Sequence, residues 1–435
     1  MPKATSSLFG IYNRVAFPLM KAGAGVASLV SEKLRKTIEG RKDLQLTVER
    51  HYSVIPKDRL RVLAHVASFG ELEQAKPVIE CLKERYPTCH IHLTFFSPSG
   101  YENAAGRYKH ADLITYSPID DEECVRDFLD LARPDIVLFA RYDVWPNFAM
   151  ELARRSVPTL LFSATGGLSS GRFMPLVKGL HRDVYGSLSH ICAIGDEDRA
   201  AFVELGIDAT RVSVSGDTRF DQVVARKHAI ASAGTELLPP EILARIEERG
   251  TFVFVAGSIW PKDLAVMKRS IAASLARHDN VLYILVPHEP DDAHVKQLME
   301  LATGDCIRLS NIEQYARESV IVVDSIGKLF GLYRYADAAY VGGGFGAGVH
   351  NLLECAVWGK PSMLGPKHER SREAGELIRR VGAFEVRDAR EFEFVFWRLL
   401  NDQDLRESAG AAASGFVETG CGATSAIMDQ VTALI

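Results

Sequence analysis

The sequence has little of what several protein classes require. Its 435 residues carry 51 Lys and Arg against 56 Asp and Glu, a net charge of −5, so no positive field attracts nucleic acid. The seven Cys are an odd number without a CxxC pair, which argues against a disulfide framework or a structural zinc site. With 47% hydrophobic and 25% charged residues, the chain has the composition of globular domains, and its length allows two or three.

Several catalytic motifs are missing as well. No GxSxG elbow and no distinguished Cys supports a nucleophile, and no HExxH or DxD-type cluster stands out as a catalytic metal site. The chain has no GxxxxGK[ST] loop, and its glycines do not follow GxGxxG, which excludes a P-loop and a dinucleotide fingerprint. We therefore expect no cofactor, no metal and no nucleic-acid partner.

Residues 1–45 are expected to form an amphipathic segment that associates with a membrane. Arg14 and Lys21 interrupt the apolar run at 8–30, so neither a full span nor a cleavable signal peptide is expected. Apolar residues recur at helical spacing, at Leu8, Ile11, Tyr12, Val15, Leu19, Val26 and Leu29. Basic residues follow, at Lys33, Arg35, Lys36, Arg41 and Lys42. The pattern is typical of a helix lying in an anionic membrane surface, with packing on its own domain as the alternative.

Short β-rich runs alternate with longer helical patterns from residue 60 onward. This alternation predicts an α/β protein with two doubly wound, Rossmann-like domains. We expect an N-terminal domain at 46–230, a C-terminal domain at 231–410 and a helix at 411–435 that is able to cross back to the N-terminal domain. Ligands bind beyond the carboxyl ends of parallel strands, so the active site is expected in the interdomain cleft.

A glycine-rich loop between a strand and a helix is the strongest local pattern, at residues 338–366. Its glycines leave backbone amides open to a phosphate, and a helix expected to start near His350 adds N–H groups and a positive dipole end. Glu354, about one turn into that helix, is a candidate acceptor for ribose hydroxyls. A turn made only for tight packing is the alternative.

Two further loops after strands carry candidate residues. Ser258 is expected either to hold a phosphate or to cap the helix that begins near Pro261. Ser68, Gly70 and Glu71 stand between a strand and a long helix, where Glu71 is either a general base or a favourable charge at a helix start. Other loops after strands offer more polar residues for the same cleft, or for caps and salt bridges, namely Arg141, Asp143, Asn147, Arg172 and Arg219.

In their order along the chain, these motifs resemble the 3-deoxy-D-manno-octulosonic acid (Kdo) transferases of lipopolysaccharide synthesis, inverting glycosyltransferases of the GT-B fold. The resemblance spans nearly the whole chain. It rests on HVASFGE at 65–71 with Pro77 downstream, PSGYE at 98–102, DVWPN at 143–147, GDTRFDQ at 216–222 and the long segment from Asp324 to Pro361.

The resemblance implies a role for each group of residues. Glu71 would be the catalytic base. The C-terminal domain would bind the donor CMP-Kdo through Ser258, His288, Gly327, Gly343, Gly344, Gly348, His350, Asn351 and Glu354. The acceptor or the donor carboxylate would be contacted by Ser68, Gly70, Asn147, Arg172 and Arg219.

The same resemblance implies an acceptor and a place in the cell. The acceptor would be a lipid A precursor, lipid IVA, and the enzyme would lie peripherally on the cytoplasmic face of the bacterial inner membrane. Residues at the donor site depart from the family's pattern: His288 and Glu289 stand where an Arg-His pair is common, and Lys328 where a Glu is common. Arg141 and Tyr142 replace family residues ahead of DVWPN. Another GT-B nucleotide-sugar enzyme, a transferase or a 2-epimerase, and a non-catalytic GT-B scaffold are the alternatives.

Overall fold

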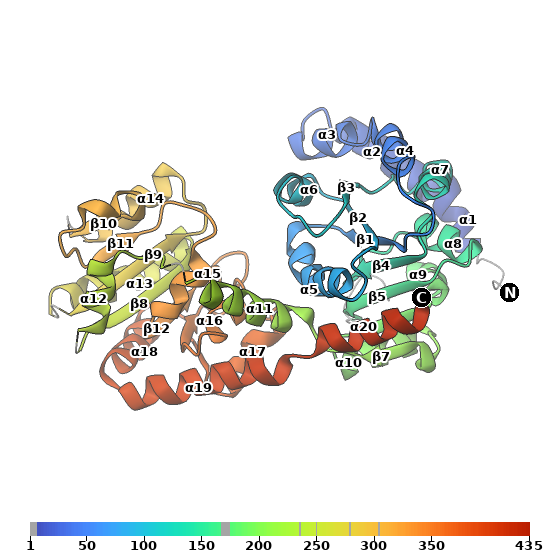
Figure 1. The fold of residues 1–435 in the computed structure, drawn as a ribbon. Coiled ribbons are helices and arrows are strands. Elements are labelled where there is room, and N and C mark those ends of the chain that lie inside the picture. Colours follow the sequence, from blue (N-terminus) through green and yellow to red (C-terminus); the bar gives the residue numbers. More distant parts are fainter. Residues whose placement is uncertain (1–6, 167–174, 235, 249, 278–279, 303–304) are drawn as a thin grey trace. The chain divides into compact units, whose positions relative to one another are not determined.

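A computed structural model describes the chain except for residues 1–6, 167–174, 235, 249, 278–279 and 303–304. The chain divides into two compact units. Unit 1 is Met1–Gln222 with Cys421–Ile435, and unit 2 is Val223–Gly420. Each unit is a parallel sheet covered by helices on both faces, as the alternation of strand and helix patterns predicts (Figure 1).

The sheet of unit 1 has the strand order β3-β2-β1-β4-β5-β6-β7, and every pair is parallel. Its strands are β1 Arg61–Val66, β2 His90–Phe95, β3 Leu113–Tyr116, β4 Ile136–Ala140, β5 Thr159–Ala164, β6 His190–Ala193 and β7 Val212–Val214. The order reverses between β1 and β4, where Val62 pairs with Ile136 and His65 with Phe139. Such a reversal opens a crevice at the carboxyl ends of the strands, so the loops after β1 and β4 are the ones that position a site.

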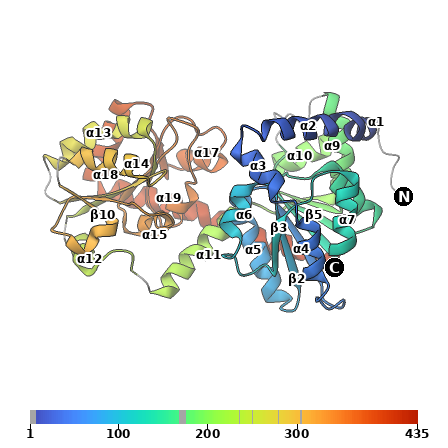
Figure 2. The ribbon, with the colours of Figure 1, turned by 90° about the horizontal axis from the view of Figure 1, so that it is seen from above.

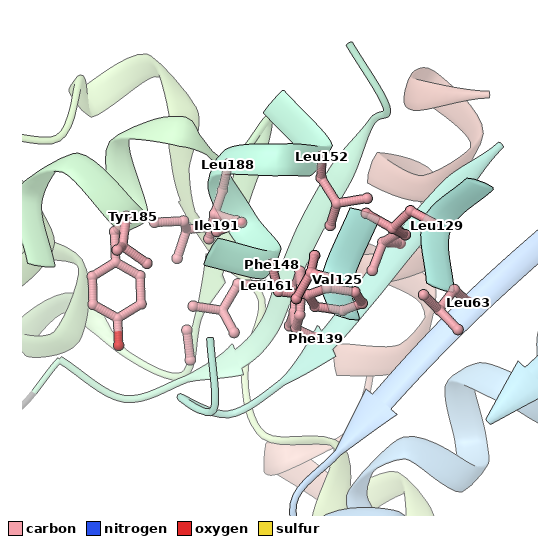
Figure 3. Packing of buried hydrophobic residues seen from close by; sticks show 14 of the residues in the cluster. Leu63, Val125, Leu129, Phe139, Phe148, Leu152, Leu161, Tyr185, Leu188 and Ile191 are labelled. Carbon is pink, nitrogen blue, oxygen red and sulfur yellow. The ribbon is translucent and has the colours of Figure 1, made fainter. Parts of the chain in front are cut away.

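Helices cover both faces of this sheet. They are α4 Leu44–Tyr52, α5 Phe69–Arg85, α6 Pro98–Ala104, α7 Glu122–Ala132, α8 Pro146–Arg154, α9 Pro175–Ser187 and α10 Asp196–Leu205. Successive residues of β1 point to opposite faces: Leu63 packs with Leu129, Phe139 and Phe148 in one core (Figure 3), while its neighbours Val62 and Ala64 belong to the other. Both faces of the sheet are therefore hydrophobic, which explains the fully buried β1.

The N-terminal segment forms a chain of short helices on unit 1. These are α1 Ser7–Ile11, a π-helical turn Tyr12–Ala16, α2 Phe17–Ala27 and α3 Glu32–Glu39, and the three α-helices follow one another along one side of the unit (Figure 2). The Tyr12 hydroxyl donates to Asp120 Oδ2 at 2.8 Å, and Asn13 Nδ2 donates to Glu122 Oε1 at 2.6 Å. Side chains around the π-helical turn thus connect the segment to the start of α7 and to Asp120 just before it.

Unit 2 repeats the plan with the strand order β10-β11-β9-β8-β12-β13-β14, again all parallel. Its strands are β8 Phe252–Ile259, β9 Val281–Pro287, β10 Cys306–Arg308, β11 Val320–Val322, β12 Ala338–Val341, β13 Ser362–Leu364 and β14 Ala383–Glu385. Its helices are α12 Pro240–Glu247, α13 Pro261–Leu275, α14 Asp292–Met299, α15 Leu329–Leu332, α16 Leu353–Ala356, α17 Arg372–Arg379, α18 Ala389–Asn401 and α19 Gln403–Gly420. Here the order reverses between β8 and β12, so the loops after these two strands flank the crevice of unit 2.

The structure differs from the expected boundaries in two places. The division falls after Gln222, inside helix α11 (Thr218–Ala233), rather than at residue 230, because one continuous helix carries the chain out of unit 1. The end of the chain is two helices, α19 and α20 (Ala423–Leu434), and α20 alone belongs to unit 1. Asp221 accepts hydrogen bonds from the backbone N–H groups of Gly422 and Thr424, which fixes the start of α20.

Candidate active site

Glu71 stands at the third position of α5, directly after the loop that leaves β1. Ser68 Oγ accepts a hydrogen bond from the Glu71 N–H at 3.4 Å, and Glu71 Oε2 accepts one from the N–H of Ala67. The side chain is 3% exposed. Burial raises the pKa of its carboxyl, and the Ala67 N–H opposes that shift. A buried carboxylate with a raised pKa has the property that a general base near neutral pH needs.

Titratable side chains from β1 and from the loop after β4 act on Glu71. The charge of Asp143 adds to the rise of its pKa, whereas His65 and Arg141 lower it. His65 is held between two partners, with Nε2 at 3.2 Å from Asp143 Oδ2 and Nδ1 at 3.0 Å from Thr94 Oγ1. The two strands at the reversal of the sheet order therefore bring an acid, a histidine and an arginine to the surroundings of Glu71.

Arg141 shows two features that are uncommon away from functional sites. Its φ is +69°, in the left-handed region that residues with a Cβ rarely adopt. Its Nε is buried without a hydrogen-bond partner among the described residues. Backbone strain and unsatisfied buried polar atoms concentrate at ligand sites, which makes Arg141 a candidate contact for an anionic substrate group.

Other expected contacts in unit 1 are engaged within the fold. Asn147 is buried, and its Nδ2 donates to Asn13 Oδ1 at 2.8 Å and to the Asp120 carbonyl at 2.5 Å. The guanidinium of Arg219 forms an ion pair with Asp217 at 2.8 Å. Gly70 lies uncrowded in the first turn of α5, and Arg172 lies outside the described residues. Roles for these residues in substrate binding stay predictions.

A second buried carboxylate, Asp263, organises the crevice of unit 2. It is 0% exposed at the third position of α13, after the loop that leaves β8. Asp263 Oδ2 accepts the N–H groups of Trp260 and Gly343, both at 2.9 Å, and Oδ1 accepts the Tyr340 hydroxyl at 2.8 Å. Asp263 therefore ties the loop after β8 to the loop after β12. The sequence reasoning missed it, although an acid three residues after a helix cap is a recognised capping signal.

The glycine loop after β12 is a compact series of turns. A Cβ on Gly342 would collide with the Ser258 carbonyl, and one on Gly344 with the backbone of Gly365, so both positions require glycine. Among the described residues, no acceptor takes the backbone N–H groups of Gly344, Phe345 or Ala347. Unpaired backbone N–H groups in a glycine-rich turn are candidate donors for an anion.

The expected helix near His350 begins later and is much shorter. It is α16, Leu353–Ala356, and the side chain of Asn351 accepts the Leu353 N–H at 3.1 Å just before it. The chain at His350 instead continues the turns, with the His350 N–H donating to the Gly342 carbonyl at 3.1 Å. A four-residue helix supplies little dipole, so the loop amides are the main anion donors here.

Trp260, His288 and His350 form an aromatic group beside the glycine loop. The rings of Trp260 and His288 stack with centroids 4.1 Å apart, and His288 and His350 lie 4.7 Å apart. The indole Nε1 of Trp260 donates to His350 Nε2 at 3.1 Å. An indole N–H only donates, so neutral His350 carries its proton on Nδ1. Burial lowers the pKa of His350, which favours this neutral form, and Trp260 is a second site residue that the sequence reasoning missed.

The remaining donor-site candidates have mixed surroundings. Ser258 has a φ of +53° at a bulge near the end of β8, which places a strained residue opposite the glycine loop. Gly327 has a φ of +88° in the turn before α15, with open space around it. Glu354 accepts from Arg226 of α11 at 2.9 Å, so any ribose contact by this carboxylate would share it with an arginine.

One group of side chains among the described residues has metal-ligand geometry, formed by Glu289, Asp291 and His294. Glu289 and Asp291 are exposed, and Asp291 caps α14 through the His294 N–H at 2.9 Å while bonding to the His294 ring at 2.7 Å. Capping accounts for Asp291 and His294 without an ion.

The N-terminal segment exposes several large apolar side chains. These side chains are between 51% and 91% exposed, and they are Ile11, Val15, Leu19, Met20, Val26, Leu29 and Val30. Tyr12, expected in the same stripe, is instead buried against Asp120. Among the described residues, no helix is long and apolar enough to cross a bilayer.

Arg41, expected among the exposed basic residues, is also turned inward. It donates to the carbonyls of Phe96 and Ser117 at 3.0 and 2.8 Å, and burial lowers its pKa to about 10. Its guanidinium is thus occupied by the fold, so it does not contribute to a basic surface.

Comparisons with known proteins find the same family that the sequence motifs resemble. The family model described as 3-deoxy-D-manno-octulosonic-acid transferase (kdotransferase) matches residues 39–222. A 3-deoxy-D-manno-octulosonic acid transferase of Haemophilus influenzae is 25% identical over 374 residues, 85% of this chain and 86% of that protein. One of Bordetella pertussis is 27% identical over 381 residues, again 85% of this chain and 86% of that protein. These matches confirm the resemblance to the Kdo transferase family that the sequence motifs indicate.

Members of the Kdo transferase family are glycosyltransferases, and the fold agrees with solved enzymes. UDP-GlcNAc 2-epimerase from Neisseria meningitidis bound to UDP-GlcNAc superposes with a TM-score of 0.61 at 14% identity, covering 85% of this chain and 99% of that chain. The enzyme of the same name from Methanocaldococcus jannaschii gives 0.54 at 14% identity, covering 82% and 98%. At such identities the likeness concerns the fold alone, and it confirms the expected GT-B class of two doubly wound sheets.

Proposed function

We propose that this protein is a Kdo transferase that transfers Kdo from CMP-Kdo to a lipid A precursor, lipid IVA, with inversion at the anomeric carbon. Unit 1 binds the acceptor and unit 2 binds the donor. The observation that carries the proposal is the buried carboxylate of Glu71, whose pKa is raised at the head of α5. A base is needed because the acceptor hydroxyl is a poor nucleophile until its proton is removed.

The proposed reaction needs one base, Glu71, and one leaving group, CMP. Glu71 takes the proton of a glucosamine hydroxyl as its oxygen attacks the anomeric carbon of Kdo from the face opposite CMP. The new C–O bond forms as the bond from that carbon to the phosphate oxygen breaks, and CMP leaves with the electron pair. Because attack and departure occur on opposite faces, one displacement inverts the configuration.

The charge that develops on the leaving phosphate needs fixed donors. The free N–H groups of Gly344, Phe345 and Ala347 are suited to this, since donors that are already oriented cost no reorganisation in the transition state. The Nδ1–H of His350 is a further donor beside the same loop. We therefore expect transfer to continue in the presence of a chelator.

The lipid acceptor accounts for the exposed apolar surface on α1, α2 and the turn after α2. We propose that these side chains enter the interface of an anionic membrane, the cytoplasmic face of the bacterial inner membrane, and hold the enzyme peripherally near its acceptor. Replacing Leu29 and Val30 together by Glu should weaken flotation with anionic vesicles strongly. Circular dichroism should first show that the Leu29 and Val30 variant keeps the native fold. This check separates weaker membrane binding from unfolding, which the same change at the buried residues Leu63 and Phe139 would cause.

The decisive experiment is a transfer assay with CMP-Kdo generated in situ and a tetra-acylated lipid A precursor, with mass spectrometry of the lipid. A mass gain of one or more Kdo residues, unchanged by chelator, is the expected result. Folded protein that gives no gain while the donor is present would reject the proposal and favour another GT-B nucleotide-sugar reaction. In that case, turnover of UDP-sugars would be measured next.

A further inference from the structure

A cavity of about 490 Å³ lies in unit 1 where β1 begins, at the opposite end of the strand from Glu71. Five residue steps at about 3.3 Å each separate Arg61 from Val66, so the two ends of β1 are about 16 Å apart. Its basic lining residues are Lys57, Arg61 and Arg133. Nothing in the proposed transfer reaction uses this end of the strand.

Arg61 is the unusual member of the lining. It is only 8% exposed, yet among the described residues no side chain or carbonyl accepts a hydrogen bond from its guanidinium, and its Nε is buried without a partner. Its backbone N–H and carbonyl are satisfied by Asp135 at 2.7 and 2.8 Å, so the deficit belongs to the side chain alone. A guanidinium does not deprotonate in proteins, so a buried one needs an acceptor.

The residues around Arg61 do not supply that acceptor. Its guanidinium lies over the ring of Tyr52, 5.3 Å from the centroid, which returns only part of the lost hydration. Among the acidic residues of the lining, Asp130 forms an ion pair with Arg155 at 2.8 Å, and Asp135 accepts the Arg61 backbone. Glu49 completes the acidic set on α4, without an ion pair to Arg61.

A second unsatisfied atom lies beside Arg61 in the sheet. Its partner on β2 is His90, whose ring is fully buried and whose Nδ1 has no hydrogen-bond partner among the described residues. The other ring nitrogen of His90 bonds to His51 Nε2 at 2.8 Å. Two orphaned polar atoms on paired residues indicate that a polar group is missing at this end of the sheet.

We propose that this cavity binds a small phosphate-bearing molecule through Arg61. The planar fork of a guanidinium binds two phosphate oxygens at once, which an ammonium group does not do. Lys57 and Arg133 at the rim add charge of the same sign. The phosphate belongs either to a soluble metabolite or to a lipid headgroup, and both sources offer the same oxygens to Arg61.

Thermal unfolding of the full chain tests the soluble source. Inorganic phosphate and glycerol 3-phosphate should raise Tm relative to chloride at equal ionic strength, by about 3 °C at ten times the Kd. Arg61→Met should abolish the shift, and in chloride alone it should unfold no lower than the wild type, because it removes an uncompensated buried charge. Arg59→Met is the matched control: this exposed residue outside the lining loses the same charge and should keep the shift.

Vesicles test the lipid source. Binding to phosphatidylcholine vesicles that contain phosphatidate should fall in Arg61→Met but not in Arg59→Met if the headgroup is the ligand. Arg61→Lys keeps the charge and serves as a second variant in both arms, with an expected loss of about tenfold in affinity. The proposal is overturned if neither phosphate source gives an effect that depends on Arg61.

Discussion

The two units place an acidic residue at the same structural position and use it differently. Glu71 is the third residue of the helix after β1, and Asp263 is the third residue of the helix after β8. Both helices start where the strand order of their sheet reverses. Glu71 accepts one backbone N–H, whereas Asp263 accepts two N–H groups and a hydroxyl. The same local design gives a candidate base in one unit and a structural anchor in the other.

The neighbouring strand decides the difference. In unit 2, the loop after β12 brings the Gly343 N–H to Asp263, so this carboxylate accepts three hydrogen bonds in all. In unit 1, the loop after β4 brings the carboxylate Asp143, and its negative charge adds to the rise in the pKa of Glu71 that burial causes. A carboxylate surrounded by donors holds loops together, and one that faces another acid is available to take a proton.

The largest expected effect is the loss of transfer in Glu71→Gln. If Glu71 is the base, kcat should fall by about 10²–10⁴-fold. The free energy of unfolding should stay equal or rise, because the buried carboxylate no longer has to ionise while the amide oxygen still accepts the Ala67 N–H. Transfer kinetics and urea unfolding of one preparation measure both quantities.

Glu73→Gln is the control for this change, since it alters a neighbouring glutamate that pairs with Lys76. It should transfer Kdo normally. If folded Glu71→Gln transferred Kdo at a near-normal rate, as the control should, Glu71 would not be the catalytic base.

Asp263→Asn should lower the free energy of unfolding by about 3 kcal/mol. The NH₂ group of the new asparagine would face the N–H and O–H groups that now donate to Asp263, so at least one of these buried donors would lose its acceptor. Asp292→Asn, at an exposed position in the same unit, should change stability by less than about 0.5 kcal/mol. Urea unfolding compares the two, and equal stability of both variants would contradict the anchoring role.

Asp120 tests whether hydrogen-bond donors alone are enough to keep a buried carboxylate ionised. It accepts the Tyr12 hydroxyl and the N–H groups of Asn147 and Phe148, yet burial raises its pKa to about 7. The folded state then keeps a proton that the unfolded state releases, so the stabilisation is full below about pH 4 and is lost as the pH rises toward 7.

Asp120→Asn removes this titration. The stability of the wild type should therefore fall relative to Asp120→Asn by about 1 kcal/mol per pH unit between pH 5 and pH 7. Unfolding measured across that range gives the difference directly, and parallel curves for the two proteins would show that Asp120 is already ionised.

The smallest effect is expected from Trp260→Phe. It keeps an aromatic ring against His288 but removes the N–H that holds His350 Nε2, a loss of about 1 kcal/mol or roughly fivefold in the donor KM. Nitrogen NMR should show the proton of His350 redistributed between Nδ1 and Nε2. Trp358→Phe removes an indole hydrogen bond to the Phe330 carbonyl and should leave His350 unchanged.

Much of the fold could be predicted from the sequence because strands that are buried on both faces of a parallel sheet appear in the sequence as short apolar runs. All seven strands of unit 1 coincide with such runs, and so do six of the seven in unit 2. The strand that was missed, β10 Cys306–Arg308, has one aliphatic residue between a cysteine and an arginine, so it does not form an apolar run. Helix ends were harder: the helix expected at His350 begins at Leu353, because turns of the glycine loop continue past the last glycine.

Some residues of the candidate site could likewise be placed from the sequence, and others could not. Glu71 and the glycine loop follow strands closely, so their placement could be inferred from local order along the chain. Ser258, expected in the loop after a strand, lies instead within β8, and Trp260 stands at the N-cap of α13. Asp263 and Trp260 could not be chosen in advance, because their importance comes from Gly343 and His350, eighty and ninety residues away. Asn147 and Arg219 carried the right chemistry in the sequence, and the structure shows their side chains bonded to Asn13 and Asp217.

The sequence by itself determined the two doubly wound sheets, the resemblance to Kdo transferases and the loops that carry polar residues, since strand periodicity, glycine spacing and helix caps are local properties. Only the tertiary structure decided which carboxylate is surrounded by donors and which is left to titrate. It also revealed that Arg61 is buried without an acceptor. Burial and the neighbours of a charge depend on residues far apart in the chain, and these are what set the free energy of each protonation state.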